Sequence, residues 1–228
     1  MNERGKFQTG MNYKKLADDP EVIAYYDCGN AILGALGFTD HSSAHAKVVA
    51  EHARYILKTL DYSHHDVELA GIAGYLHDIG NAINRTHHAE HGAMLARDIL
   101  TRTDLKLDDR VRIIAAIANH DESTGTAYDP ISAALILADK PDVRRNRVRT
   151  KDPRQFDMHD RVNYAVVGHK LNCSKEKKSI SLNLQIDEDI CTMIDYFEIF
   201  LGRMIMCRRA AEVLGICFKL KANGQKVL

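Results

Sequence analysis

The chain has 228 residues, of which 45% are hydrophobic and 27% are charged, and its 31 basic residues balance its 31 acidic residues. These proportions are typical of a globular protein with one large domain, or one domain and an appendage. A formal net charge of zero argues against a general nucleic-acid binder or membrane-surface protein. Use of the basic run from Arg144 to Arg154 as a nucleic-acid surface is therefore disfavoured.

The cysteines and the N-terminus indicate the compartment. The five cysteines are odd in number and widely spaced, and no Cys-x-x-Cys occurs. This pattern predicts reduced thiols rather than a disulfide framework. Residues 1–12 are expected to form a frayed polar leader and not a signal peptide, and no apolar run is long enough to span a membrane. We therefore predict a cytoplasmic protein.

Residues 14 to about 145 predict helix after helix, joined by short polar loops, because apolar residues recur there at helical spacing. Pro141 ends this series, since the residue before a proline is pushed out of the helical conformation. The predicted helices are 16–36, a long helix that runs from the capping cluster 39–43 to residue 60, 66–76, 89–100, 111–119 and 132–139.

The pattern changes after Asp142, where apolar residues begin to alternate with polar ones. Strands are predicted at 163–171, 179–186 and 216–220, with a helix at 188–214 capped by Asp187 and a turn at Asn223-Gly224. We predict an α+β fold, with a helical domain over residues 14–148 and a small α/β subdomain over 149–228. The long helix should pack on its own sheet, although its broad apolar face leaves a homodimer open.

Potential metal ligands lie at the edges of the predicted helices. All of them are nitrogen or oxygen donors and none is a thiolate, which suits Fe, Mn, Zn, Ni or Co. Six ligands exceed the need of one tetrahedral zinc, so two adjacent divalent ions are predicted. The ligands are His45, His77, Asp78, His88, His120 and Asp139.

Each of these residues also has an ordinary explanation. His45 could lie on the surface of a first helical turn, His88 in a solvated loop and His120 at a polar helix exit. Asp139 could be a simple helix-end acid, although a free carboxylate after a run of apolar residues is costly. The His77-Asp78 pair and its spaced partners together favour a metal site over these alternatives.

The order of these motifs resembles the HD-domain superfamily of metal-dependent phosphohydrolases over about residues 40–145. The segments that carry the resemblance are Ser43–Val48, Leu76–Gly80 and Ala138–Lys140. The histidines in His88–Ala93 and Asn119–Asp121 resemble those of the subgroup that holds two metals.

The resemblance implies two metal positions that share Asp78. His45, His77, Asp78 and Asp139 would hold one ion, while Asp78 would bridge to a second ion held by His88 and His120. It also implies a phosphohydrolase that cleaves a phosphate ester or anhydride of a nucleotide or small phosphorylated metabolite by a metal-activated hydroxide, with His77 and Asp78 as catalytic residues. The alternative is a metal- or ligand-binding regulatory module with little activity.

Two departures from the family narrow the range of substrates that the resemblance implies. Asn81 stands where a lysine often follows the motif glycine, and the Gly-Tyr-Pro of the cyclic-dinucleotide branch is missing after His120. The layout is closer to small HD enzymes that split symmetrical dinucleoside tetraphosphates. Four basic residues after Asp139 are candidate phosphate contacts, with a solvated basic linker as the alternative. These are Lys140, Arg144, Arg145 and Arg147, while Asp121 and Glu122 are expected to orient a ligand histidine.

Overall fold

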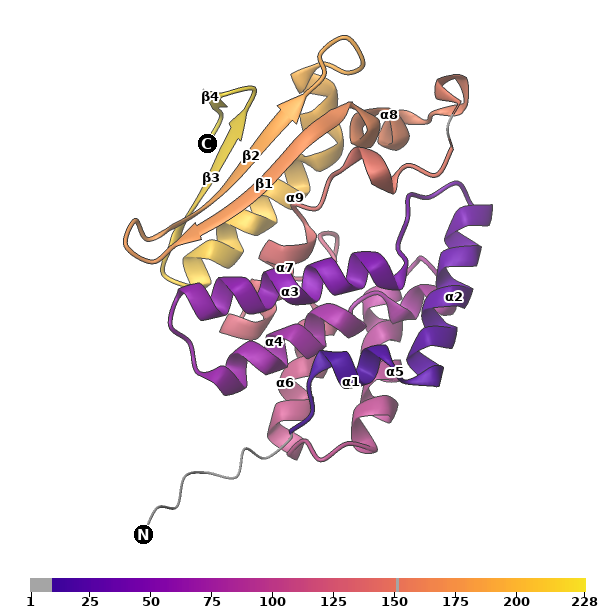
Figure 1. Ribbon diagram of the computed structural model, residues 1–228, viewed down its shortest axis with the longest axis vertical. Helices are drawn as coiled ribbons and strands as arrows, with labels where there is room; N and C mark the ends of the chain where they lie inside the picture. Colours follow the sequence, from indigo (N-terminus) through magenta and orange to yellow (C-terminus); the bar gives the residue numbers. More distant parts are fainter. Residues whose placement is uncertain (1–9, 151) are drawn as a thin grey trace.

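The computed structural model describes residues 10–150 and 152–228, so most of the predicted leader lies outside the described residues. A group of helices forms the larger part, and a small sheet with one long helix sits at one end of it (Figure 1). This arrangement confirms the predicted α+β class. The helices of the larger part are α1 Tyr13–Ala17, α2 Pro20–Ala35, α3 Ser43–Thr59, α4 His64–Leu76, α5 His88–Thr101, α6 Leu107–Ala118 and α7 Pro130–Asp139.

The first predicted helix is in fact two. The side chain of Asp19 accepts a hydrogen bond from the backbone N–H of Glu21 at 2.8 Å, and Pro20 occupies the first position of α2. Aspartate is a favourable N-cap, and proline is favourable directly after it, because the first helical N–H groups have no partner within the helix. The Asp-Pro pair therefore begins a new helix and separates α1 from α2.

Helix α7 is the centre of the helical part. Every residue from Ile131 to Ala138 is buried, and α7 packs against α3, α4 and α6 on one side and against the long helix α9, Met193–Val213, on the other. A helix that is apolar all round must be covered all round. Its C-terminal residue, Asp139, is consequently delivered to the interior of the molecule.

The C-terminal part contains a four-stranded sheet of order β1-β2-β3-β4. Strands β2 and β3 are parallel and are connected by α9, while the other two strand pairs are antiparallel. The predicted turn at Asn223-Gly224 joins β3 to β4. The remaining elements are α8 Met158–Ala165, β1 Val166–Ser174, β2 Ser179–Ile186, β3 Cys217–Ala222 and β4 Gln225–Lys226, with 3-10 turns at Ile79–Ala82, Arg145–Arg147 and Pro153–Gln155.

Two element boundaries in this part differ from the prediction. The strand expected from residue 163 starts at Val166, because Asp157 caps α8 and the helix continues to Ala165. The long helix starts at Met193 rather than at residue 188, because Thr192 and Asp195 form a capping box. None of the described helices is both long and apolar enough to cross a membrane.

Candidate metal centre

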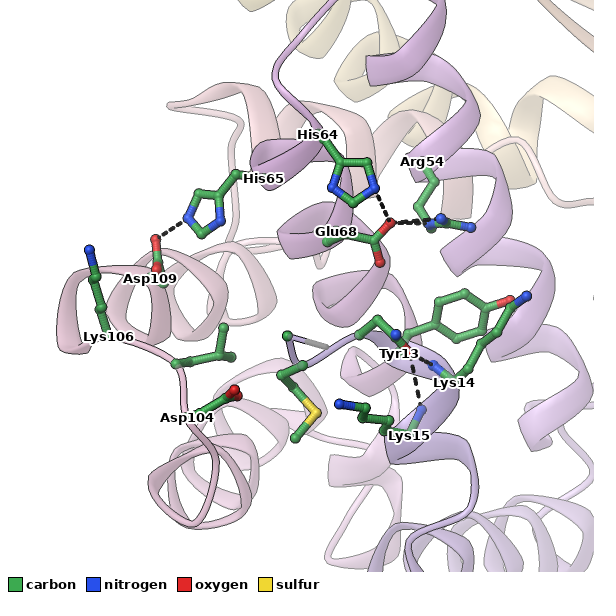
Figure 2. A pocket seen from close by; sticks show the side chains of 14 residues that line it. Tyr13, Lys14, Lys15, Arg54, His64, His65, Glu68, Asp104, Lys106 and Asp109 are labelled. Carbon is green, nitrogen blue, oxygen red and sulfur yellow. Dashed lines mark hydrogen bonds and ion pairs between the residues drawn. The ribbon is translucent and has the colours of Figure 1, made fainter. Parts of the chain in front are cut away.

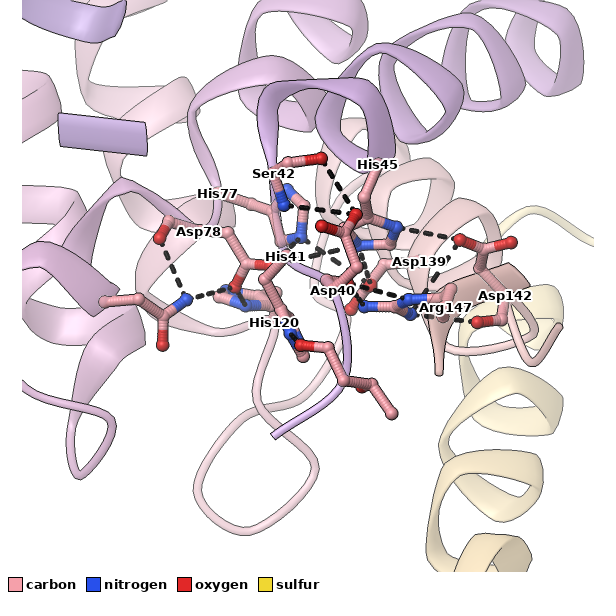
Figure 3. Close-up of polar contacts among 12 residues, drawn as sticks. Asp40, His41, Ser42, His45, His77, Asp78, His120, Asp139, Asp142 and Arg147 are labelled. Atoms are coloured by element: carbon pink, nitrogen blue, oxygen red, sulfur yellow. Dashed lines mark hydrogen bonds and ion pairs between the residues drawn. The ribbon is translucent and has the colours of Figure 1, made fainter. Parts of the chain in front are cut away.

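The predicted ligands are positioned by five separate helices. His45 lies in the first turn of α3, His77 and Asp78 follow the end of α4, and His88 is the first residue of α5. His120 follows α6, and Asp139 ends α7. All six side chains are buried. Figure 3 shows five of them, all except His88, gathered with their side chains turned toward one another.

The first ligand set surrounds one oxygen of Asp78. Oδ2 of Asp78 lies 3.2 Å from Nε2 of His77 and 3.8 Å from Nε2 of His45. Oδ1 of Asp139 lies 3.3 Å from Nε2 of His45 and 3.6 Å from Nε2 of His77. Two imidazole nitrogens and two carboxylate oxygens therefore converge on one position.

The second ligand set faces the other oxygen of the same carboxylate. Oδ1 of Asp78 lies 3.6 Å from Nε2 of His88 and 4.0 Å from Nε2 of His120. These two nitrogens are 3.2 Å apart. Asp78 thus stands between two groups of histidines, with one oxygen directed at each. This is the arrangement that a bridging carboxylate requires.

Each ligand histidine is oriented by a hydrogen bond to its other ring nitrogen. Such an outer contact fixes the ring and leaves Nε2 available for a metal. Within the described part of the chain, the buried Nε2 atoms of His45 and His77 have no hydrogen-bond partner. The donor set therefore fits a divalent cation. The acceptors are the backbone oxygens of Gly74 for His77 at 2.8 Å, Arg85 for His88 at 3.2 Å and Ile117 for His120 at 2.6 Å, and the carboxylate of Asp142 for His45 at 2.7 Å.

The electrostatics of the cluster favour bound positive charge. Burial lowers the pKa of His77, but the carboxylates of Asp78 and Asp139 outweigh it and raise that pKa to about 10. Burial raises the pKa of Asp78, yet the neighbouring His77 holds the pKa of this carboxyl group well below its usual range. Burial keeps the pKa values of His88 and His120 below their usual value. The carboxylates of Asp78 and Asp139 therefore stabilise positive charge at this position, which is what a divalent cation would supply.

Gly80 allows two segments of backbone to approach each other closely. It lies in the 3-10 turn after Asp78, and a Cβ there would overlap the carbonyl oxygen of His88 and the amide of Gly92. A glycine is needed wherever two backbones approach this closely. Because α5 touches the turn at Gly80, its first residue, His88, reaches the oxygen of Asp78.

A cavity of about 10 Å³ opens beside the ligands. Four cationic side chains line it together with the ligands and His41. The sequence drew attention to Lys140, and Arg147 falls in the basic run, but nothing in it marked His41, Arg85 from the loop before α5 or Arg203 from α9. The lining cations are Arg85, Lys140, Arg147 and Arg203.

A chain of ion pairs connects a ligand to the C-terminal helix. Lys140 Nζ lies 2.9 Å from Oδ2 of Asp139 and 2.8 Å from Oε2 of Glu122. The other oxygen of Glu122 accepts a hydrogen bond from Nε of Arg203 at 2.9 Å. Although burial raises it, Lys140 and Arg203 hold the pKa of Glu122 well below its usual range. Glu122 therefore fixes both cations at the cavity.

Of the three predicted arginines, Arg147 lines the cavity, whereas Arg144 and Arg145 do not reach it. Arg144 donates to Oδ2 of Asp142 at 3.0 Å, and the guanidinium of Arg145 lies 4.3 Å over the ring of Tyr164. Neither lines the cavity. Asp121 lies as expected beside a ligand, with Oδ2 3.5 Å from Nδ1 of His88.

A larger cavity of about 640 Å³ lies away from this cluster, between α1, the start of α4 and the start of α6 (Figure 2). Charged residues in its wall pair with each other, as Arg54 does with Glu68 at 2.7 Å and His65 with Asp109 at 2.8 Å. It shares no lining residue with the small cavity beside the candidate ligands. We therefore place the functional site at the cluster.

Comparison with known proteins agrees with the motif analysis. The family model described as "HD domain" matches residues 42–164. An uncharacterized protein of Methanocaldococcus jannaschii is 30% identical over an alignment of 173 residues that covers 65% of this chain and 66% of that protein. The chain thus spans slightly less than two thirds of that relative. A crystal structure described as a predicted HD superfamily hydrolase from an uncultured Thermotogales bacterium matches with a TM-score of 0.42 and 24% identity, over 59% of this chain and 75% of the other.

Proposed function

The chain belongs to the HD-domain family, and on that premise we propose that it is a metal-dependent phosphohydrolase. Its substrate is a phosphate ester or anhydride of a nucleotide or small phosphorylated metabolite. The observation that carries the proposal is that Asp78 faces two ligand sets inside a cavity rimmed by cations. The ligands suit divalent metals, and the cations suit phosphoryl oxygens.

The residues present fit two divalent ions of the Fe, Mn, Ni or Zn kind. His45, His77, Asp78 and Asp139 would hold one ion, and Asp78, His88 and His120 the other. When bound, the ions supply Lewis-acid polarisation to the phosphate group and to an attacking water. The protein's part is to hold the ligands in place, which the hydrogen bonds on the far side of each imidazole do.

Two cations are placed to contact the phosphate. Lys140 is held between Asp139 and Glu122, so its ammonium is fixed next to the ligand cluster. Arg203 donates a hydrogen bond from Nε to Glu122, and its two terminal nitrogens have no acceptor among the described residues. These two nitrogens are therefore left for phosphoryl oxygens. Arg147 is assigned a structural role, because it donates to the backbone oxygens of Asp40 and Asp142.

The proposal is tested by loading the purified protein with Mn²⁺, Fe²⁺, Ni²⁺ or Zn²⁺ and measuring phosphate release. The panel contains nucleoside phosphates, symmetrical dinucleoside tetraphosphates and sugar phosphates. We expect release from at least one class, and loss of both metal and activity in Asp78→Ala. Asp104→Asn changes an exposed loop acid and serves as the control. Full metal content with no phosphate release from any compound would overturn the proposal.

A further inference from the structure

A second cavity adjoins the metal cavity. It has a volume of about 100 Å³ and shares His41, Arg85, Arg147 and Arg203 with the inner cavity. Its remaining walls come from the loop before α3, from α8 and the residue that caps it, and from Phe200 of α9. We call this space the vestibule.

The sizes of the two cavities indicate which part of the substrate each of them can hold. A space needs about 10–15 Å³ to hold one water, so the inner cavity of about 10 Å³ has room for about one water-sized group and none for a leaving group. The vestibule is about ten times larger. The part of the substrate that leaves with the ester oxygen must therefore lie in the vestibule.

The two ends of the vestibule differ in charge. Its inner end carries the guanidinium groups of Arg85 and Arg203. Its outer end is formed by α8 and its cap, with Asp157, Asp160 and Asn163 in the wall. A molecule that fits this gradient carries negative charge at one end and hydrogen-bond donors at the other.

Asp160 is the most informative of the outer residues. It is 8% exposed, and no cationic side chain within residues 10–150 and 152–228 forms an ion pair with its carboxylate. Burial, together with the neighbouring Asp157, raises the pKa of Asp160, although a hydrogen bond from the backbone of Asp157 acts against that rise. A buried carboxylate without a cationic partner is unfavourable, so this position is stabilised by any ligand that brings a positive charge.

Asn163 adds a second acceptor beside it. Its Nδ2 donates to the backbone oxygen of His159 at 2.9 Å, so its Oδ1 is the atom left for a ligand. Asn163 is also buried, at 6% exposure. One carboxylate and one amide oxygen, both withdrawn from solvent, together match an ammonium or amino group better than a hydrocarbon or a second anion.

We propose that the vestibule binds the leaving group of the substrate, and that this group carries an amine recognised by Asp160 and Asn163. The substrate class is then a small phosphate ester of an amino alcohol or amino sugar. This inference rests on the proposed phosphohydrolase function and assigns substrate selection to α8 of the C-terminal subdomain. An ester that lacks the amine leaves the carboxylate of Asp160 buried without a counter-charge, which is the condition for strong discrimination.

Matched pairs of esters test the inference on the metal-loaded protein. The pairs are O-phosphoethanolamine with ethyl phosphate, and glucosamine 6-phosphate with glucose 6-phosphate. We expect kcat/KM to favour the amine member of at least one pair by roughly tenfold or more. Asp160→Asn should abolish that preference by lowering kcat/KM for the amine member of the pair. Glu198→Gln removes an exposed carboxylate from α9 outside the vestibule and should keep the preference.

The outcomes separate this inference from the proposed function. Phosphate release at equal kcat/KM from both members of each pair would overturn the vestibule inference and leave the phosphohydrolase standing. If no ester is hydrolysed, calorimetry still tests the vestibule inference by comparing the affinities of the protein for O-phosphoethanolamine and for ethyl phosphate. Equal affinities, or no detectable binding of either ester, would overturn the vestibule inference. Both comparisons use the unaltered chain, so they remain decisive even if Asp160→Asn fails to fold.

Discussion

Asp142 accepts a hydrogen bond from Nδ1 of His45 at 2.7 Å, and this contact decides which ring nitrogen of His45 faces the metal cluster. Both residues are buried, and Nη1 of Arg147 lies 3.8 Å from the same carboxylate oxygen. A carboxylate behind a ligand imidazole fixes the ring and makes its other nitrogen a better donor to a metal. The sequence placed Asp142 three residues after the last ligand but gave no reason to single it out.

Replacing this outer carboxylate should weaken the first metal position without removing a ligand. For Asp142→Asn we expect metal affinity to fall by about 10–100-fold, which is the usual effect of losing such a partner. Competition with a chelator, followed by elemental analysis, measures the affinity. The exposed Asp104→Asn is the control. Unchanged affinity in Asp142→Asn would show that the contact does not orient the ligand.

The bridging geometry of Asp78 predicts unequal losses of metal among the ligands. His88 faces only one oxygen of Asp78, so His88→Ala should keep one ion per chain, whereas Asp78→Ala should keep none. Elemental analysis after metal loading gives both stoichiometries. His87→Asn is the neighbouring control, since His87 is exposed at φ 60° and asparagine tolerates that conformation. Equal metal content in the two ligand variants would contradict two positions that share Asp78.

Gly80 and Gly202 make a matched pair for the packing of the site. Gly80→Ala forces a Cβ into the backbone of α5, so we expect destabilisation of about 1–3 kcal/mol. Gly202 lies on the exposed face of α9 with nothing within 4 Å of an added Cβ, so Gly202→Ala should stabilise the protein by about 0.5–1 kcal/mol. Urea unfolding followed by circular dichroism measures both. A neutral Gly80→Ala would mean that the close approach to α5 is dispensable.

The gathering of the candidate ligands was predictable because short helices deliver their end residues to one place. His45, His77 and Asp139 were named from motif order and helix periodicity, and the structure brings their side chains together. Helix ends were less predictable, since capping by Asp19 and Thr192 decided them locally. Such caps compete with the apolar periodicity that a sequence shows over a longer window.

The rim of the site could not be predicted in the same way. Arg144 and Arg145 are close to Asp139 in sequence, yet their partners lie away from the cavity. Arg203 is 64 residues beyond Asp139 in the chain and reaches the cavity only because α9 packs on α7. Asp160 similarly depends on how α8 is placed. Side chains that come from another part of the fold carry no local motif, so only the packing of the two parts reveals them.

Arg203 offers the test of whether α9 takes part in the reaction. Its guanidinium lines the cavity and is held by Glu122 at 2.9 Å, while no hydrogen bond or ion pair within the described part of the chain joins it to a candidate metal ligand. Arg203→Ala should therefore lower kcat/KM for phosphate esters by about 10–100-fold, equivalent to about 1.4–2.8 kcal/mol, and leave metal content unchanged. Arg203→Lys should recover only part of the loss, because an ammonium cannot form two parallel hydrogen bonds to a phosphate.

The control for Arg203 is on the same helix. Arg208 is exposed on α9 and lines an apolar groove with Phe197 and Leu220 rather than the metal cavity, so Arg208→Ala should keep full activity. Steady-state kinetics and elemental analysis on the same preparations separate a phosphate contact from a structural role. Loss of metal in Arg203→Ala would show that the arginine supports the ligand cluster instead. Unchanged kcat/KM at full metal content would show that Arg203 of α9 does not contribute to the reaction.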